Sequence, residues 1–190
     1  MSQEAAQSSF QGKIALKTRP VIWIIAALYL LETFFFFCNW WSMGITYPVH
    51  RIVIFSLSLS PLFAVLWVKL AGRILYAVGR WFKGGASYSD VVSSLVFSKT
   101  PFVLAAALWI FLLFLSPDTL FIQDSGIPYS IHVNFIYLTL AVWSFTLLVQ
   151  SICKVQGFSR LRSFGACALS WLIGFALFFV IFNLYRYFLI

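Results

Sequence analysis

Five long runs of this chain carry almost no charged side chains, and they limit most strongly what the chain can fold into. A run of roughly 20 apolar residues can cross the hydrocarbon core of a bilayer as one α-helix. Only 9% of the 190 residues are charged and 62% are hydrophobic, whereas a soluble domain has about 25% charged residues. The composition therefore excludes a soluble enzyme, a disordered tail and a nucleic-acid-binding domain. It predicts an all-α integral membrane protein.

The uncharged runs give the positions of five predicted transmembrane helices. We expect spans at about residues 21–41, 52–72, 100–117, 131–153 and 164–186. Residues 1–19 are predicted to form a short polar cytoplasmic tail, and residues 20–190 a single membrane domain.

Basic residues are distributed unevenly between the two predicted sides of the membrane. All but two of the 13 basic residues lie before span 1, in the last turn of span 2 or the loop that follows it, or between spans 4 and 5. The two others are Arg51 and Arg186. Because positively charged loops stay in the cytoplasm, we expect a cytoplasmic N-terminus and a C-terminus outside.

The loop between spans 2 and 3 begins with a basic amphipathic stretch. Four cations recur at helical spacing on one face and are expected to contact lipid headgroups: Lys69, Arg73, Arg80 and Lys83. This helix either extends span 2 or lies in the headgroup layer. Gly84 and Gly85 are predicted to break it, because glycine adopts left-handed conformations without a Cβ penalty.

A second short helix is predicted after this break. Ser87 and Asp90 have the spacing of a capping box, in which each group satisfies an N–H of the first helical turn. Pro101 marks the boundary before span 3, because the residue preceding a proline disfavours helix. The loop between spans 4 and 5 repeats the Gly-x-Ser order of Gly85 and Ser87 at Gly157 and Ser159, so a repeat of helical hairpins is one interpretation.

These motifs carry a family resemblance. The stretch GGASYSDVV (residues 84–92), placed before Thr100-Pro101 and an apolar span, resembles the central motif of the Yip1 domain family. The stretch QSICKVQGFSRLR (150–162) resembles its late motif, and the resemblance covers roughly residues 52–185. The family-like positions are expected to be mainly architectural: Gly85, Ser87, Tyr88, Pro101, Gly157 and Ser159.

The resemblance implies a five-helix membrane protein. Eukaryotic relatives act in vesicle trafficking, bind small GTPases and one another, and usually carry a long cytosolic N-terminal region. The tail of residues 1–19 is short, which argues against small-GTPase binding and favours the compact prokaryotic type in a bacterial cytoplasmic membrane. We therefore expect a non-enzymatic membrane-organisation or trafficking factor without a cofactor or metal. Its partners would be membrane lipids and other membrane proteins or a second copy.

Glu32 is the acidic residue within the predicted spans. It lies near the bilayer midplane, where a carboxylate is costly and is by default a functional-site hypothesis. Spans 1 and 2 should pack antiparallel, which places Glu32 opposite Ser56 and Ser60. Glu32 is then either a protonated, hydrogen-bonded structural group or the centre of a small proton- or cation-linked transporter or channel.

Three further patterns leave alternatives open. His50 and His132 begin spans 2 and 4, so a haem between them would indicate the membrane anchor of a redox complex. Asp118 and Asp124 form either a solvated outer loop or a cation site. A small-residue stripe in span 5 packs inside the bundle or in a dimer: Ala166, Ser170 and Gly174. The three cysteines are expected to be small core residues: Cys38, Cys153 and Cys167.

Overall fold

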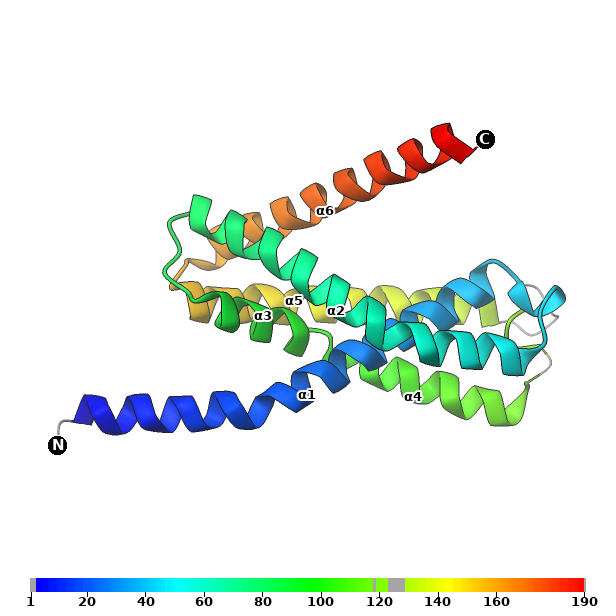
Figure 1. The fold of residues 1–190 in the computed structure, drawn as a ribbon, viewed down its shortest axis with the longest axis horizontal. Coiled ribbons are helices and arrows are strands. Elements are labelled where there is room, and N and C mark those ends of the chain that lie inside the picture. Colours follow the sequence, from blue (N-terminus) through cyan, green and yellow to red (C-terminus); the bar gives the residue numbers. More distant parts are fainter. Residues whose placement is uncertain (1–2, 118, 123–128, 190) are drawn as a thin grey trace. The chain divides into compact units, whose positions relative to one another are not determined.

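The chain is helical almost throughout in a computed structural model that describes residues 3–117, 119–122 and 129–189 (Figure 1). The elements, in chain order, are α1 (Gln3–Trp40), the short 3-10 helix η1 (Met43–Ile45), α2 (Val49–Trp81), α3 (Tyr88–Phe97), α4 (Thr100–Leu115), α5 (Tyr129–Gln156) and α6 (Arg160–Leu189). α1 begins within the predicted polar tail, so the tail continues into the first span as one helix.

Five segments of the described chain are long and apolar enough to cross a membrane, which confirms the predicted number. They are Pro20–Trp40, Val49–Trp81, Tyr88–Leu115, Phe135–Gln156 and Arg160–Ile181. The second is much longer than predicted because α2 continues unbroken through the basic stretch after residue 72. Of the two alternatives for that stretch, the structure shows the extension of span 2.

The third segment also differs from the prediction. The sequence places a span at 100–117 and assigns the preceding short helix to a loop, whereas α3 and α4 together form one candidate segment. Only Ser98 and Lys99 separate the two helices. Their junction stays compact because Ser98 Oγ donates to Leu95 O at 2.7 Å and Lys99 N donates to Val96 O at 2.9 Å.

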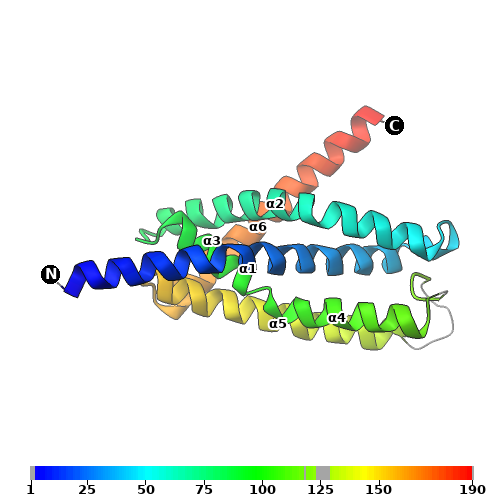
Figure 2. The ribbon, with the colours of Figure 1, turned by 60° about the horizontal axis from the view of Figure 1, so that its bottom comes forward.

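The helices group into two compact units. Unit 1 comprises Met1–Val65 and Phe102–Ser125, and unit 2 comprises Leu66–Pro101 and Gly126–Ile190. In unit 1, α1 and the first half of α2 run side by side (Figure 2), and Phe34 meets Phe63 edge-on at 5.5 Å between ring centroids.

An aromatic cluster holds the α4 end of unit 1 against α1. The Trp109 ring stacks on Phe121 at 6.2 Å, and Phe35 lies 5.7 Å from Phe121. Two hydrogen bonds fix the segment that follows α4: Asn39 Nδ2 donates to Leu120 O at 2.6 Å, and Gly44 N donates to Phe121 O at 2.9 Å. Side-chain and backbone donors thus satisfy carbonyls that lie outside any helix.

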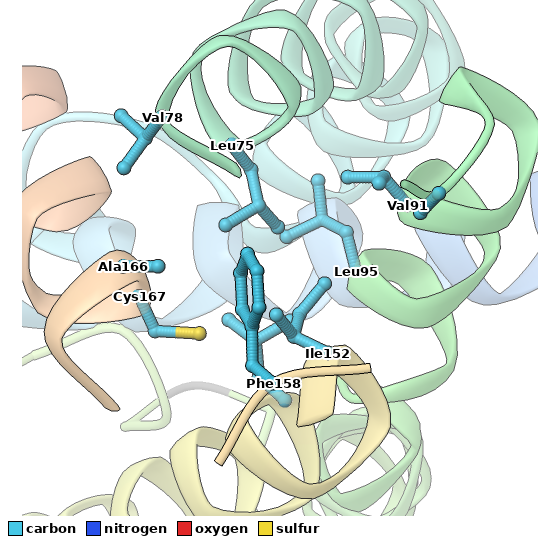
Figure 3. Packing of buried hydrophobic residues seen from close by; sticks show 10 residues of the cluster. Leu75, Val78, Val91, Leu95, Ile152, Phe158, Ala166 and Cys167 are labelled. Carbon is cyan, nitrogen blue, oxygen red and sulfur yellow. The ribbon is translucent and has the colours of Figure 1, made fainter. Parts of the chain in front are cut away.

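Unit 2 has its own apolar core (Figure 3). The core draws on the last turns of α2, on α3, on α5 and on the first turns of α6; its labelled members are Leu75, Val78, Val91, Leu95, Ile152, Phe158, Ala166 and Cys167. Cys167 is buried here and Cys38 is buried in unit 1, which confirms the prediction that they are core residues. Cys153 is half-buried and its thiol donates to Phe158 O at 3.0 Å.

The small-residue stripe of α6 is divided between two environments. Ala166 is fully buried in the core of unit 2, and Ser170 Oγ donates back to its carbonyl at 2.8 Å. A Cβ added at Gly174 would meet no atom within 4 Å among the described residues. Close packing within the bundle is therefore observed at Ala166 but not at Gly174.

The aromatic cluster should carry much of the stability of unit 1. We expect Phe35→Ala to lower the free energy of unfolding by about 3–5 kcal/mol, because the side chain is 1% exposed and its loss leaves a cavity between Trp109 and Phe121. Phe37→Ala is the matched control, because it removes the same ring from a position on the same helix where the side chain is 44% exposed. Denaturant titration of the full chain in detergent measures both, and equal losses would contradict the assignment.

Candidate functional site

The polar residues predicted inside unit 1 are all buried, but they are not arranged as predicted. Glu32, Ser56 and Ser60 are 1%, 0% and 3% exposed. The thiol of Cys38 is the polar group beside Ser56, and Ser56 Oγ forms no hydrogen bond of regular geometry with a described residue. Ser60 Oγ donates to Leu57 O at 3.4 Å within its own helix.

The register of α1 against α2 explains this difference. Cys38 lies level with Ser56, and Phe34 lies level with Phe63. In an antiparallel pair these contacts place Glu32 level with residues 62–65, beyond Ser56 by more than one turn. Of the two predicted hydroxyl partners of Glu32, Ser56 is therefore excluded, because its Oγ has no hydrogen-bond partner among the described residues, and the Ser60 hydroxyl donates to Leu57 O. Glu32 Oε2 instead accepts a long hydrogen bond from Thr33 Oγ1 at 3.5 Å.

The structure provides little for the predicted haem or cation sites. His50 is exposed in the first turn of α2. The side chain of His132 lies outside the described residues, as do Asp118 and Asp124. Among the residues that are described, no group of three or more His, Cys, Asp and Glu side chains could hold a metal ion.

The end of unit 2 where α2 meets α3 and α5 meets α6 is the most elaborately built polar region. We call this region, residues 79–90 and 153–163, the basic end. α2 finishes with Lys83 in the left-handed conformation at φ 62°, and Gly84 N donates to Gly79 O at 2.9 Å. This bond closes a Schellman-type helix end. The predicted helix break is thus present, but the left-handed residue is Lys83 rather than either glycine.

Gln156 is the central group of the basic end, and the sequence analysis did not identify it. Its side chain is buried, and its Oε1 accepts a hydrogen bond from Ala86 N at 3.2 Å. A Cβ on Gly79 or on Gly84 would overlap the Gln156 amide, and one on Gly84 would also lie 2.8 Å from Phe158 Cζ. Both glycines are therefore required for close approach, whereas Gly85 has nothing within 4 Å.

The predicted cap of α3 is confirmed, with one change in its geometry. Ser87 is the N-cap, and its Oγ accepts from Asp90 N at 3.2 Å. The Asp90 carboxylate accepts from the Ser87 hydroxyl at 2.6 Å, rather than from the Ser87 backbone as in the predicted box. The Tyr88 ring packs edge-on against Tyr76 at 5.8 Å, which joins α3 to α2.

The second loop of the basic end has the same two features as the first: a left-handed residue that ends one helix and a serine that caps the next. Gly157 is left-handed at φ 69°, and Phe158 N donates to Cys153 O at 3.2 Å, closing α5. Ser159 Oγ then accepts from Arg162 N at 3.4 Å at the start of α6. The predicted correspondence of Gly85 with Gly157 does not hold, because the left-handed partner of Gly157 is Lys83. Pro101 is buried in the first turn of α4, but the residue before it, Thr100, is already helical, so the boundary lies at Ser98 and Lys99.

Cations surround this framework. The four predicted headgroup contacts are all exposed, three on α2 and Lys83 just beyond its end: Lys69, Arg73, Arg80 and Lys83. Arg80 Nη1 donates to Gly84 O at 3.4 Å, and the Arg162 guanidinium lies 5.8 Å above the Phe158 ring. Lys154 and Arg160 are exposed on the second loop. The arrangement is a hydrogen-bonded backbone scaffold with exposed positive side chains around it, which suits binding of anionic surfaces.

Lys99 is a second feature that the sequence analysis missed. It was counted among the cations of the loop, but its Nζ donates to Ser144 Oγ at 3.2 Å. Ser144 is buried halfway along the candidate span Phe135–Gln156. Lys99 interrupts an otherwise uncharged run of residues 91–117, so its charge makes residue 100 the predicted start of span 3. Without Lys99, the predicted cytoplasmic side still carries most of the basic residues.

Comparison with known proteins identifies one family. The family model described as Yip1 domain matches residues 9–181, nearly the whole chain. Comparison with curated proteins gave no match, and comparison with solved structures gave none either.

Adjacent glycines offer a matched test of the basic end. We expect Gly84→Ala to lower the free energy of unfolding by about 1–3 kcal/mol, because the new methyl group displaces Gln156 and breaks its bond to Ala86. Gly85→Ala should be neutral, since its Cβ meets nothing within 4 Å and its φ is not positive. Denaturant titration and hydrogen exchange at Ala86 N–H measure both, and equal effects at the two glycines would refute the role of Gln156.

Proposed function

This chain belongs to the Yip1 domain family, and on that premise we propose that it is a non-enzymatic membrane-organisation or trafficking factor. It is a multi-pass membrane protein with five helices that can span the bilayer. In this proposal it acts by binding: its helices contact other membrane proteins or a second copy, and its basic end contacts anionic lipid headgroups and partner proteins.

The observation that carries the proposal is the construction of the basic end. Gln156, the Schellman-type ends and the two serine caps fix the backbone of both loops. The surrounding cations are exposed and free to meet a ligand: Lys69, Arg73, Lys83, Lys154 and Arg160. A scaffold of this kind supports a binding surface.

The use of hydroxyl groups in the described chain supports a non-enzymatic role. Most of them donate to carbonyls of their own helices or cap a helix, as Ser58, Ser93, Thr139 and Thr146 do. A catalytic hydroxyl would need a base within hydrogen-bond reach. We therefore assign these serines and threonines to helix structure.

A second candidate function rests on Glu32. Its carboxyl group is 1% exposed in the middle of Pro20–Trp40, where a charged form is costly and where transporters place proton- or cation-binding groups. A small transporter or channel centred on Glu32 is the alternative that this observation favours.

The basic asymmetry supports an orientation. We place the N-terminus and both loops of the basic end in the cytoplasm, with the C-terminus outside, in a bacterial cytoplasmic membrane.

Reporter fusions test this orientation. Fusions inserted at Gly85 and ending at Ser159 should be fluorescent as GFP and inactive as alkaline phosphatase, because both loops carry the excess of basic residues. A fusion after Ile190 should show the opposite pattern. A cytoplasmic reporter after Ile190 would mean that an even number of helices crosses the membrane.

A complementation experiment separates the two candidate functions. Deletion of the gene should change the abundance of other integral membrane proteins, measured by quantitative proteomics of membranes. We expect a triple variant (Lys69→Gln, Arg73→Gln and Arg80→Gln) to fold but fail to restore the wild-type pattern, because the anionic contacts are lost. Glu32→Gln should restore it, since an amide can replace a neutral carboxyl group.

The reverse result would favour the transporter. If Glu32→Gln fails at unchanged thermal stability while the triple variant restores the pattern, a titrating carboxyl group is required and the exposed cations of α2 are not. Glu32→Leu serves as the stability control for the buried position, since it removes all hydrogen-bonding capacity.

A further inference from the structure

A groove between α5 and α6, near the basic end, has the form of a lipid site. It has a volume of about 580 Å³, within the range of small-molecule sites. One stripe of α5 lines it, together with Arg160 and Phe164 of α6. The residues of that stripe recur at helical spacing: Phe145, Thr146, Val149, Gln150, Cys153 and Lys154.

The body of the groove is apolar. The Phe145 and Phe164 rings meet edge-on at 5.6 Å and form its inner end, with Val149 beside them. Thr146 Oγ1 donates to Val142 O at 2.8 Å, so its hydroxyl is already satisfied within α5. From Lys154 to Phe145 the groove follows α5 for about 14 Å at 1.5 Å per residue. That length is close to half the hydrocarbon core, about 15 Å, which is the depth of one leaflet.

The opposite end of the groove is cationic. Lys154 in the last turn of α5 and Arg160 in the first turn of α6 are both exposed at its mouth. No acidic side chain is among the described residues that line it. Two cations above an apolar channel of leaflet depth match a ligand with an anionic head and a hydrocarbon chain.

We propose that this groove binds one anionic phospholipid, with its phosphate between Lys154 and Arg160 and one acyl chain along Val149, Phe145 and Phe164. Basic pockets between transmembrane helices on the cytoplasmic side hold such headgroups in other membrane proteins. The exposed Gln150 amide lies one turn below Lys154, at the level where the glycerol ester groups would be. This site specifies one of the lipid contacts of the proposed function. It rests on that function only for the assignment of the groove to the cytoplasmic side of the membrane.

Native mass spectrometry of the full chain tests the proposal. The protein is purified in detergent with equal amounts of phosphatidylglycerol and phosphatidylcholine, and retained lipids are counted. We expect one tightly retained phosphatidylglycerol. The double variant Lys154→Ala and Arg160→Ala should weaken its retention about 30-fold, since each basic residue near a headgroup contributes about fivefold. The matched control Lys13→Ala and Lys17→Ala removes the same charge from the segment before the first span and should retain the lipid.

A second pair of variants tests the apolar body without changing charge. Val149→Trp fills the groove and should abolish retention, whereas Val142→Trp, on an exposed position of the same helix, should leave it unchanged. Thermal unfolding checks that all variants are folded. If a variant does not fold, the remaining pair still decides the question.

Several outcomes would overturn the proposal. Equal losses in the two charge variants would show general surface attraction, and equal retention of both lipids would show that the head is not recognised. Displacement of the lipid by inorganic phosphate at equal concentration would identify a phosphate site instead. Dimers that dissociate in Val149→Trp, with no retained lipid in the wild type, would assign the groove to a second copy. Retention is measured on purified protein, so these outcomes are independent of the complementation result.

Discussion

Backbone hydrogen bonding without water is the constraint on which the rest of this structure depends. In hydrocarbon each unsatisfied N–H or C=O is costly, so the spanning segments are helices. The places where the helices break are then the places that need other partners. Asn39 supplies one for Leu120 O, and Gln156 supplies one for Ala86 N. These two loops are consequently tied to neighbouring helices by specific polar groups.

The same constraint shapes the basic end. Gln156 can reach Ala86 only if the two chain segments approach closely, and Gly79 and Gly84 make room for its amide. Because the scaffold uses its own polar groups internally, the exposed cations are left for external anions. The groove between α5 and α6 begins beside this scaffold, at Lys154 and Arg160. The proposed role as a membrane factor that works by contact depends on such a fixed presentation of charge.

Several local features could be predicted because they depend on neighbouring residues. The apolar runs determine five spanning helices, since length and hydropathy decide whether a segment can cross the bilayer. Ser87 and Asp90 determine a cap because the spacing of three residues brings them together in any helix start. The order of glycine, serine and proline motifs was sufficient for the family, which the match over residues 9–181 confirms.

Tertiary structure decided what depends on register and on partners distant in the chain. Glu32 and Ser56 are both buried, as their sequence positions suggest, but the packing of α1 on α2 places Cys38 beside Ser56. Nothing in the neighbouring sequence distinguishes Gln156 from other polar residues at helix ends. Its role depends on Ala86, which lies 70 residues earlier and meets it only in the folded chain. In the sequence Lys99 has the character of a loop cation. Its hydrogen bond to Ser144 forms only because α3 packs along α5. The sequence by itself determined which segments are helices and where they are capped, because those choices are made by local backbone and solvent energetics. The pairing of polar groups was decided only in the fold, because helix packing can shift by a turn at little cost in apolar contact.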